Sequence, residues 1–211
     1  IDGIAAYDGA VKGLVFGSDS DVVTSDRVAT IQAIGGTGGL KVGADFLRRM
    51  GTSKQVLISD PSWENHRALF TAAGFDVDTY PYYDAANRGI NFDGMLARLN
   101  SAEAGTIVVL HACCHNPTGY DIDPTQWDQV VATVKARNLT AFLDMAYQGF
   151  GFGIQEDGAV IQKFVDAGLS FLVSTSFSKS FSLYGERVGA LSVLCESKEE
   201  AAKVLSQLKI A

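Results

Sequence analysis

The chain is short of proline, of positive charge and of long apolar runs. Only four prolines occur among 211 residues, and no low-complexity tract accompanies them, which argues against disorder. Lysine and arginine number 17 against 24 acidic residues, and the net charge of -7 argues against a nucleic-acid partner. No apolar run approaches the roughly 20 residues of a membrane helix. No signal peptide is visible, so we expect a cytoplasmic protein with no membrane partner.

Cysteine is also scarce, with an odd set of three in which two are adjacent: Cys113, Cys114 and Cys195. Adjacent cysteines rarely pair with each other, so we expect buried, reduced thiols. The run Cys113-Cys114-His115 fits no zinc-ligand spacing, and we expect no metal site.

The periodicity alternates between strand and helix along most of the chain. Strands are predicted at 55–59, 76–80, 106–111, 140–144, 170–175 and 190–194. Helices are predicted at 4–14, 40–50, 64–73, 92–100, 124–137, 159–167 and 198–209, with 27–34 as a short approach segment. With 47% hydrophobic residues for a core, this alternation predicts an α/β fold, a mainly parallel mixed sheet with helices on both faces.

In such a sheet, ligands gather at the carboxyl ends of the strands. Three predicted strands are each followed by polar side chains: His111 and Asn116, Asp144 and Tyr147, and Ser176 and Lys179. The sequence therefore predicts a site at one edge of the sheet.

The segment from Ser174 to Gly189 is the most informative part of the chain. It places one lysine among serines at the end of a strand, and an arginine follows eight residues later. This pattern is typical of a site for a cofactor that carries both a carbonyl and a phosphate. Lys179 would form an imine, and the hydroxyls with Arg187 would hold the phosphate.

A glycine-rich turn, 35–39, is predicted to open the helix 40–50. Lys41 stands where a dinucleotide fingerprint needs glycine, and Ala44 stands where a phosphate-binding loop needs lysine, so neither nucleotide motif is present. Free N–H groups at a helix start bind anions, and the alternative is a tight turn without a ligand.

Several other side chains have both a structural and a functional interpretation. Asn116 lies in a turn and offers an amide donor to a ring oxygen. Asp144 is a helix cap or ion-pair member, or it bonds the nitrogen of a pyridine ring. Tyr147 and Trp63 are packing residues, or a hydroxyl donor and a flat surface for that ring. His66 and His111 are core histidines or supports of Asp144.

Together these segments resemble the large domain of class I aminotransferases, which bind pyridoxal 5'-phosphate (PLP) and have PLP fold type I. The bacterial aromatic-amino-acid group is nearest, with the aspartate enzymes second. The resemblance covers about 7–209, and the specific segments are 35–38, 60–66, 111–119, 144–150 and 176–189.

The resemblance implies a role for each candidate. Lys179 forms the internal aldimine with PLP and moves a proton between the substrate Cα and the cofactor. Asp144 pairs with the pyridinium nitrogen and has His66, with His111, as supporting residues. Ring and substrate contacts are implied for Tyr147, Asn116 and Trp63, and phosphate contacts for Gly36, Thr37, Ser176, Ser178 and Arg187.

The implied reaction is ping-pong transamination of aromatic L-amino acids, with dicarboxylic ones as a second class, against 2-oxoglutarate as the 2-oxo acid. Family members have about twice this length and act as homodimers. We therefore expect residues 1–211 to be one large PLP-binding domain, part of a longer chain, without the small domain that binds the substrate carboxylate. This stretch alone is expected to transaminate poorly.

Two other classes share parts of these patterns. Ser176 and Lys179 match the Ser-x-x-Lys motif of penicillin-recognising acylases, but the partner motif Lys-Thr-Gly does not occur in the chain. A PLP-binding sensor domain without transaminase activity would keep Lys179, Asp144 and Tyr147, as would other PLP chemistries such as lyases.

Overall fold

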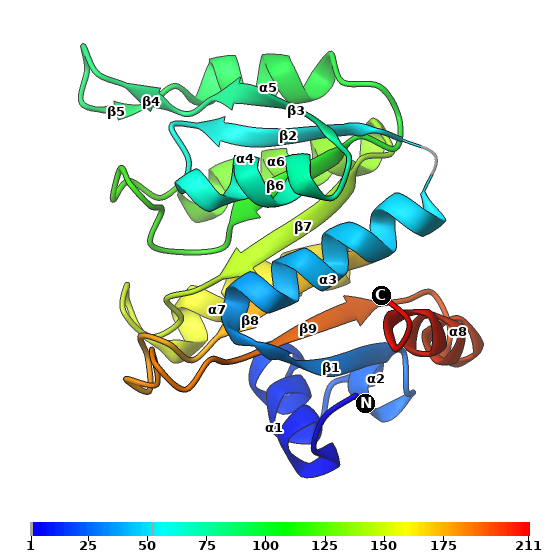
Figure 1. The fold of residues 1–211 in the computed structure, drawn as a ribbon. Helices are drawn as coiled ribbons and strands as arrows, with labels where there is room; N and C mark the ends of the chain where they lie inside the picture. Colours follow the sequence, from blue (N-terminus) through cyan, green and yellow to red (C-terminus); the bar gives the residue numbers. More distant parts are fainter. Residues whose placement is uncertain (1, 52) are drawn as a thin grey trace.

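The computed structural model describes residues 2–51 and 53–211. Its centre is a seven-stranded sheet in the order β1-β9-β8-β7-β6-β2-β3 (Figure 1). The strands are β1 (Val28–Ile34), β2 (Gln55–Asp60), β3 (Asp76–Pro81), β6 (Ile107–His111), β7 (Thr140–Met145), β8 (Phe171–Ser176) and β9 (Val188–Leu194). Neighbours from β3 to β8 pair in parallel, whereas β9 runs antiparallel to both β8 and β1. The predicted mixed, mainly parallel sheet is confirmed.

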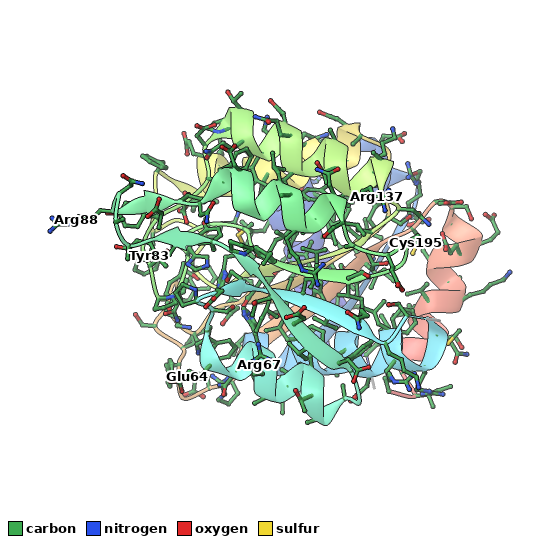
Figure 2. The ribbon with its side chains drawn as sticks, turned by 90° about the horizontal axis from the view of Figure 1, so that it is seen from above. Glu64, Arg67, Tyr83, Arg88, Arg137 and Cys195 are labelled. Atoms are coloured by element: carbon green, nitrogen blue, oxygen red, sulfur yellow. The ribbon has the colours of Figure 1, made fainter. Side chains whose placement is uncertain are left out.

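Helices cover both faces of this sheet, because successive strand residues point to opposite sides. Leu57 and Val108 join one core cluster, which also contains residues of α1 (Ala5–Phe16), α5 (Phe92–Asn100), α6 (Pro124–Ala136) and α7 (Ile154–Asp166). Val56 and Val109 join the other, with residues of α3 (Gly35–Met50), α4 (Glu64–Ala72) and α8 (Lys198–Leu208). A perpendicular view shows the sheet between the two helical layers (Figure 2).

The segment 27–34 is a strand, so its prediction as an approach segment is wrong. β1 pairs along its length with β9, from Val28 opposite Leu194 to Ile34 opposite Val188. Its first four residues are all buried, which removes the alternation that marks a half-exposed strand. Its partner also lies far along the chain, and no local pattern reveals such a pairing.

The glycine-rich segment is the first part of a helix and not a turn before one. α3 begins at Gly35, five residues earlier than predicted. A Cβ on Gly39 would lie 2.8 Å from the Ala190 carbonyl oxygen, and one on Gly36 would lie 2.9 Å from Cβ of Ser176. The glycines therefore let α3 approach β8 and β9 closely, which outweighs their low helix propensity.

Replacement of Gly39 by alanine is expected to lower the free energy of unfolding by about 1–3 kcal/mol, because the new methyl group overlaps backbone atoms. Gly9 in α1 is a matched control, since a Cβ there meets nothing within 4 Å. Alanine at Gly9 should stabilise by up to about 1 kcal/mol. Urea unfolding of both variants tests this close approach, and equal effects of the same sign would contradict it.

Smaller differences occur elsewhere. α7 begins five residues before its predicted start, and the short elements α2 (Asp21–Thr24), β4 (Tyr83–Asp84) and β5 (Gly89–Ile90) had no predicted counterpart. Asp123 caps α6 as expected, within a capping box with Gln126. Over the described ranges, no helix combines the length and apolarity needed to cross a bilayer.

Candidate active site

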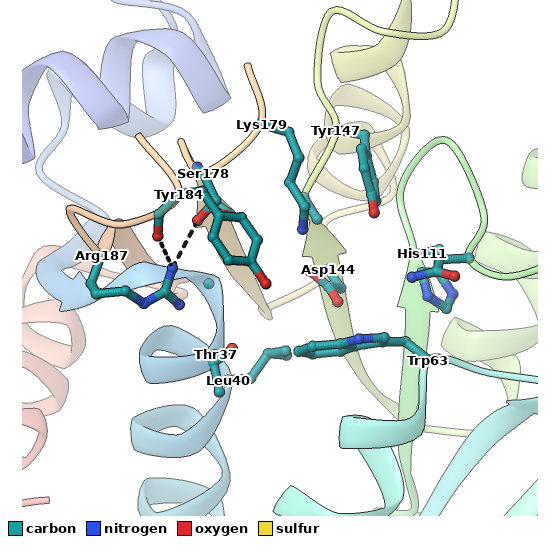
Figure 3. A pocket seen from close by; sticks show the side chains of 14 residues that line it. Thr37, Leu40, Trp63, His111, Asp144, Tyr147, Ser178, Lys179, Tyr184 and Arg187 are labelled. Atoms are coloured by element: carbon teal, nitrogen blue, oxygen red, sulfur yellow. Dashed lines mark hydrogen bonds between the residues drawn. The ribbon is translucent and has the colours of Figure 1, made fainter. Parts of the chain in front are cut away.

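A pocket opens at the carboxyl ends of β6, β7 and β8 (Figure 3). Its empty volume is ≈ 520 Å³, with open solvent included. Its lining contains every predicted site residue except His66: Gly36, Thr37, Trp63, His111, Asn116, Asp144, Tyr147, Ser176, Ser178, Lys179 and Arg187.

The antiparallel strand β9 explains how distant parts of the chain meet here. Because β9 runs against β8, its first residues lie at the edge where β8 ends, and Gly189 pairs with Ser176. β1 ends at the same edge, and the Gly35 N–H donates to the Arg187 carbonyl at 2.9 Å. The start of α3 is thereby fixed beside Arg187.

The corner of the pocket between Arg187 and the start of α3 is suited to an anion. The first turn of α3 presents N–H groups that no helical carbonyl accepts, together with the positive end of the helix dipole. Arg187 Nη1 donates to Ser178 Oγ at 3.1 Å and to the Tyr184 carbonyl at 2.8 Å, which holds the guanidinium in place. A fixed cation, hydroxyls and free N–H groups together suit a phosphate.

Lys179 lies just beyond the end of β8, and its side chain extends into the same space as Tyr147 (Figure 3). Its Nζ lies 4.7 Å from the centre of the Tyr147 ring and 6.0 Å from that of Tyr184. Within residues 2–51 and 53–211, no hydrogen bond or ion pair involves this amine. It is therefore available to a ligand.

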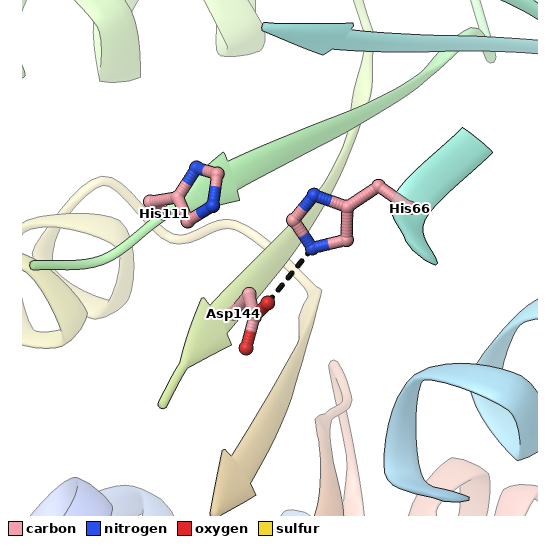
Figure 4. Close-up of side chains that lie close together, drawn as sticks. All are labelled: His66, His111 and Asp144. Carbon is pink, nitrogen blue, oxygen red and sulfur yellow. Dashed lines mark hydrogen bonds and ion pairs between the residues drawn. The ribbon is translucent and has the colours of Figure 1, made fainter. Parts of the chain in front are cut away.

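Asp144 is the buried carboxylate of the pocket, with 5% of its surface exposed. Its Oδ2 lies 2.8 Å from Nε2 of His66 (Figure 4). On the other side of the His66 ring, Nδ1 lies 2.8 Å from Ser62 Oγ. His66 is fully buried behind the pocket, so this line of contacts fixes the carboxylate. A carboxylate held in this way is suited to a charged donor of a bound ligand.

His111 also lines the pocket, but both of its ring nitrogens are buried without a hydrogen-bond partner among the described residues. Burial, and then the rings of His66 and His115, lower the pKa of His111 well below its ordinary value. His66, His111 and Asp144 each have an atom that could ligate a metal ion, and these atoms lie within 4.8 Å of one another. The His66–Asp144 contact already uses one atom of each, and the supporting role of His111 stays a prediction.

His115 stands behind His111 and was not among the candidates. It is 3% exposed, and its ring stacks on Tyr82 with centres 3.9 Å apart. Its nitrogens contact Ser59 Oγ at 2.9 Å and Thr118 Oγ1 at 2.8 Å. Burial, with a smaller contribution from His66, lowers the pKa of His115 to about 4.

This lowered pKa predicts a loss of stability in acid. The unfolded chain binds a proton at His115 below its ordinary pKa of about 6.5, while the folded chain does not until about pH 4. Stability is therefore fully present above about pH 6.5 and declines by up to roughly 3 kcal/mol as the pH falls to about 4. His115→Gln should lack this component, and urea unfolding at several pH values measures it. Parallel pH curves for the two proteins would contradict the assignment.

The sequence missed three lining residues: Leu40, Ala146 and Tyr184. Leu40 is the first residue of the predicted helix 40–50, and its apolar side chain carries no chemical signal for a site. Ala146 carries no chemical signal, although it lies between Asp144 and Tyr147. Tyr184 lies between Lys179 and Arg187, and that position was the one available signal.

A sheet-edge pocket with a lysine amine, a buried carboxylate and a helix start beside an arginine defines an α/β protein with a site suited to a small compound that carries both a carbonyl and a phosphate. The chain matches the family described as aminotransferase class I and II over residues 1–211, and it belongs to that family.

Similar proteins include enzymes named for two amino-acid classes. The chain is 61% identical to the aspartate aminotransferase of Pseudomonas aeruginosa and 56% identical to the aromatic-amino-acid aminotransferase of Escherichia coli K12, in each case over 99% of this chain. It shares 65% identity, with a TM-score of 0.98 over all of this chain, with a crystal structure of the aromatic-amino-acid aminotransferase of Burkholderia pseudomallei covalently bound to pyridoxal phosphate. The chain spans about half of these relatives, namely 52%, 53% and 53% of their lengths.

Proposed function

We propose that residues 1–211 form the large PLP-binding domain of an aminotransferase. The whole protein would exchange the amino group between L-amino acids and 2-oxoglutarate, with aromatic substrates as the first class and dicarboxylic substrates as the second. The observation that carries this proposal is the free Lys179 amine in one pocket with Asp144 and an anion corner.

The residues present fit PLP group by group. The carbonyl carbon needs an amine, and Lys179 Nζ has no other partner among the described residues. The ring nitrogen needs an anion, and Asp144 is held by His66. The phosphate needs a cationic corner, and Arg187 lies beside the start of α3. Trp63 presents its flat indole to the pocket (Figure 3).

When bound, PLP supplies an electron sink for the charge left as the substrate Cα–H bond breaks. Lys179 would anchor the cofactor and then, as a free amine, act as the general base and acid at Cα. Asp144, oriented by His66, would keep a negative charge opposite the ring nitrogen. Tyr147 and Asn116 would donate hydrogen bonds to the phenolic oxygen.

The substrate assignment rests on the relatives. The matched proteins include an aspartate enzyme at 61% identity and aromatic-amino-acid enzymes at 56% and 65% identity, and the 65% match is the reason that aromatic donors come first in the proposal. A structure of the aromatic-amino-acid aminotransferase of Psychrobacter sp. B6 was cocrystallised with aspartic acid and is 45% identical to this chain. Both classes therefore belong in the proposal, as does a homodimer with a second domain that completes the substrate site.

The test is a transamination assay of the whole protein with PLP, 2-oxoglutarate and either tyrosine, phenylalanine or aspartate. We expect glutamate to form with each, and at the highest kcat/KM with an aromatic donor. PLP binding without amino transfer from any donor would contradict the enzymatic proposal and favour a sensor domain.

A further inference from the structure

The loops that follow β6 and β7 carry the two hydrogen-bond donors proposed for the cofactor's phenolic oxygen. Asn116 lies in the first loop and Tyr147 in the second, and both line the pocket. Across the described ranges, neither the Asn116 amide nor the Tyr147 hydroxyl forms a hydrogen bond with another residue. No hydrogen bond of their own holds the two donor groups, so the backbone of each loop contributes strongly to where they lie.

Asp121 holds the loop that carries Asn116. Its two carboxylate oxygens accept the N–H groups of consecutive residues, Oδ2 from Cys114 at 2.7 Å and Oδ1 from His115 at 2.8 Å. Cys114 has a positive φ of 51°, a conformation that turns successive N–H groups toward one anion. Asn116 directly follows His115. The two charge-assisted hydrogen bonds to Asp121 therefore fix the backbone that leads into Asn116.

His115 secures the same loop from the inside. Its stacking on Tyr82 and its contacts with Ser59 and Thr118 connect the loop to β2 and to the residues after Asn116. The His115 carbonyl also accepts the Gly119 N–H at 2.8 Å. Asn116 is therefore held on both sides.

Asp157 holds the loop after β7 by accepting backbone N–H groups, as Asp121 holds the loop after β6. It is 5% exposed and lies in the first turn of α7. Its Oδ2 accepts the N–H groups of Gly149 and Gly151 at 2.8 and 2.9 Å, and its Oδ1 accepts that of Phe152 at 2.9 Å. A Cβ on Gly151 would lie 2.5 Å from Oδ1, so the loop closes tightly around the carboxylate just after Tyr147.

The two loops touch each other. Cys114 Sγ lies 4.0 Å from the Tyr147 carbonyl, and Cys113 Sγ lies 3.7 Å from Met145 Sδ. The two thiols and Asp157 each have an atom that could ligate a metal ion, and these atoms lie within 4.8 Å of one another. Burial raises the pKa of both thiols, which favours their neutral form, and both oxygens of Asp157 already accept N–H groups. We therefore interpret Cys113, Cys114 and Asp157 as a packing contact between the loops and not as a metal site.

We propose that Asp121 and Asp157 are paired positioning residues, which act through the backbone to hold the Asn116 amide and the Tyr147 hydroxyl at the cofactor's phenolic oxygen. This inference rests on the proposed PLP site. Donors at that oxygen stabilise its anionic form and so lower the pH at which the bound cofactor takes up a proton. Loosening either loop should therefore raise this pH.

The experiment is a pH titration of the visible absorption band of the PLP-loaded whole protein, with the dissociation constant of PLP as a second measurement. The variants are Asp121→Asn and Asp157→Asn, with Asn116→Ala and Tyr147→Phe as references. Asp84→Asn is the matched control, because Asp84 accepts two backbone N–H groups, from Ala86 and Asn87, in an exposed loop outside the pocket lining.

The two positioning variants should raise the titration midpoint by on the order of 0.5–1 pH unit, in the direction of the reference variants, and weaken PLP binding several-fold. Asp84→Asn should leave both values at those of the wild type. If Asp157→Asn does not fold, the exposed Asp121→Asn carries the test alone. Reference variants that shift while both positioning variants titrate as the wild type would overturn the inference. A wild type with no PLP band would overturn the proposed function itself, and the inference with it.

Discussion

Replacement of Lys179 by alanine is expected to lower kcat/KM for transamination in the whole protein by on the order of 10⁴-fold or more. The side chain has two tasks in the proposed reaction, since it anchors the cofactor and then moves the proton at the substrate Cα. Among the described residues its Nζ has no hydrogen-bond or ion-pair partner, and it extends into the pocket beside the ring of Tyr147. Lys179 is the one lysine among the described residues that line the pocket, so no other amine there can replace it.

The Lys179→Ala experiment has two controls. Lys198→Ala removes an amine that pairs with Asp26 far from the pocket, and it should keep wild-type activity. A small added primary amine should partly restore the rate of Lys179→Ala, because a free amine can accept the proton. A variant with more than a tenth of wild-type kcat/KM would remove Lys179 from its proposed role.

Replacement of Asp144 by asparagine is expected to lower kcat/KM by on the order of 10²–10³-fold, the usual effect of losing one preorganised electrostatic partner. Asparagine keeps the shape of the side chain and a carbonyl that accepts from His66, so the fold should tolerate it. It removes the negative charge that would hold a proton on the ring nitrogen.

Two comparisons make the Asp144 result specific. Asp144→Glu keeps the charge and should retain more activity than Asp144→Asn, although the longer side chain disturbs the contact with His66. Circular dichroism and urea unfolding should show both variants folded. Equal activity of the asparagine variant and the wild type would mean that the charge of Asp144 has no catalytic role.

Much of the site was predictable because several candidates closely follow a strand, and parallel strands end at one edge. Asn116, Tyr147 and Lys179 lie within five residues of the ends of β6, β7 and β8. The lysine and the arginine also carry a chemical signal of their own. The positions and directions of β1 and β9 carried no such signal, because these two strands pair across about 160 residues.

The parts that could not be predicted depend on close packing or on contacts between loops. The glycine-rich segment 35–39 was predicted as a turn because the helical role of its glycines depends on atoms of Ser176 and Ala190, far along the chain. Asp121 and Asp157 look like ordinary surface acids in the sequence, and only the folded loops show which N–H groups they accept.

The most direct test of the account is borohydride reduction of the PLP-treated whole protein, followed by peptide mapping. We expect one pyridoxyl adduct in this chain, on Lys179, with loss of the visible band on reduction. An adduct on a different lysine, or none at all, would contradict the assignment of this pocket as the cofactor site.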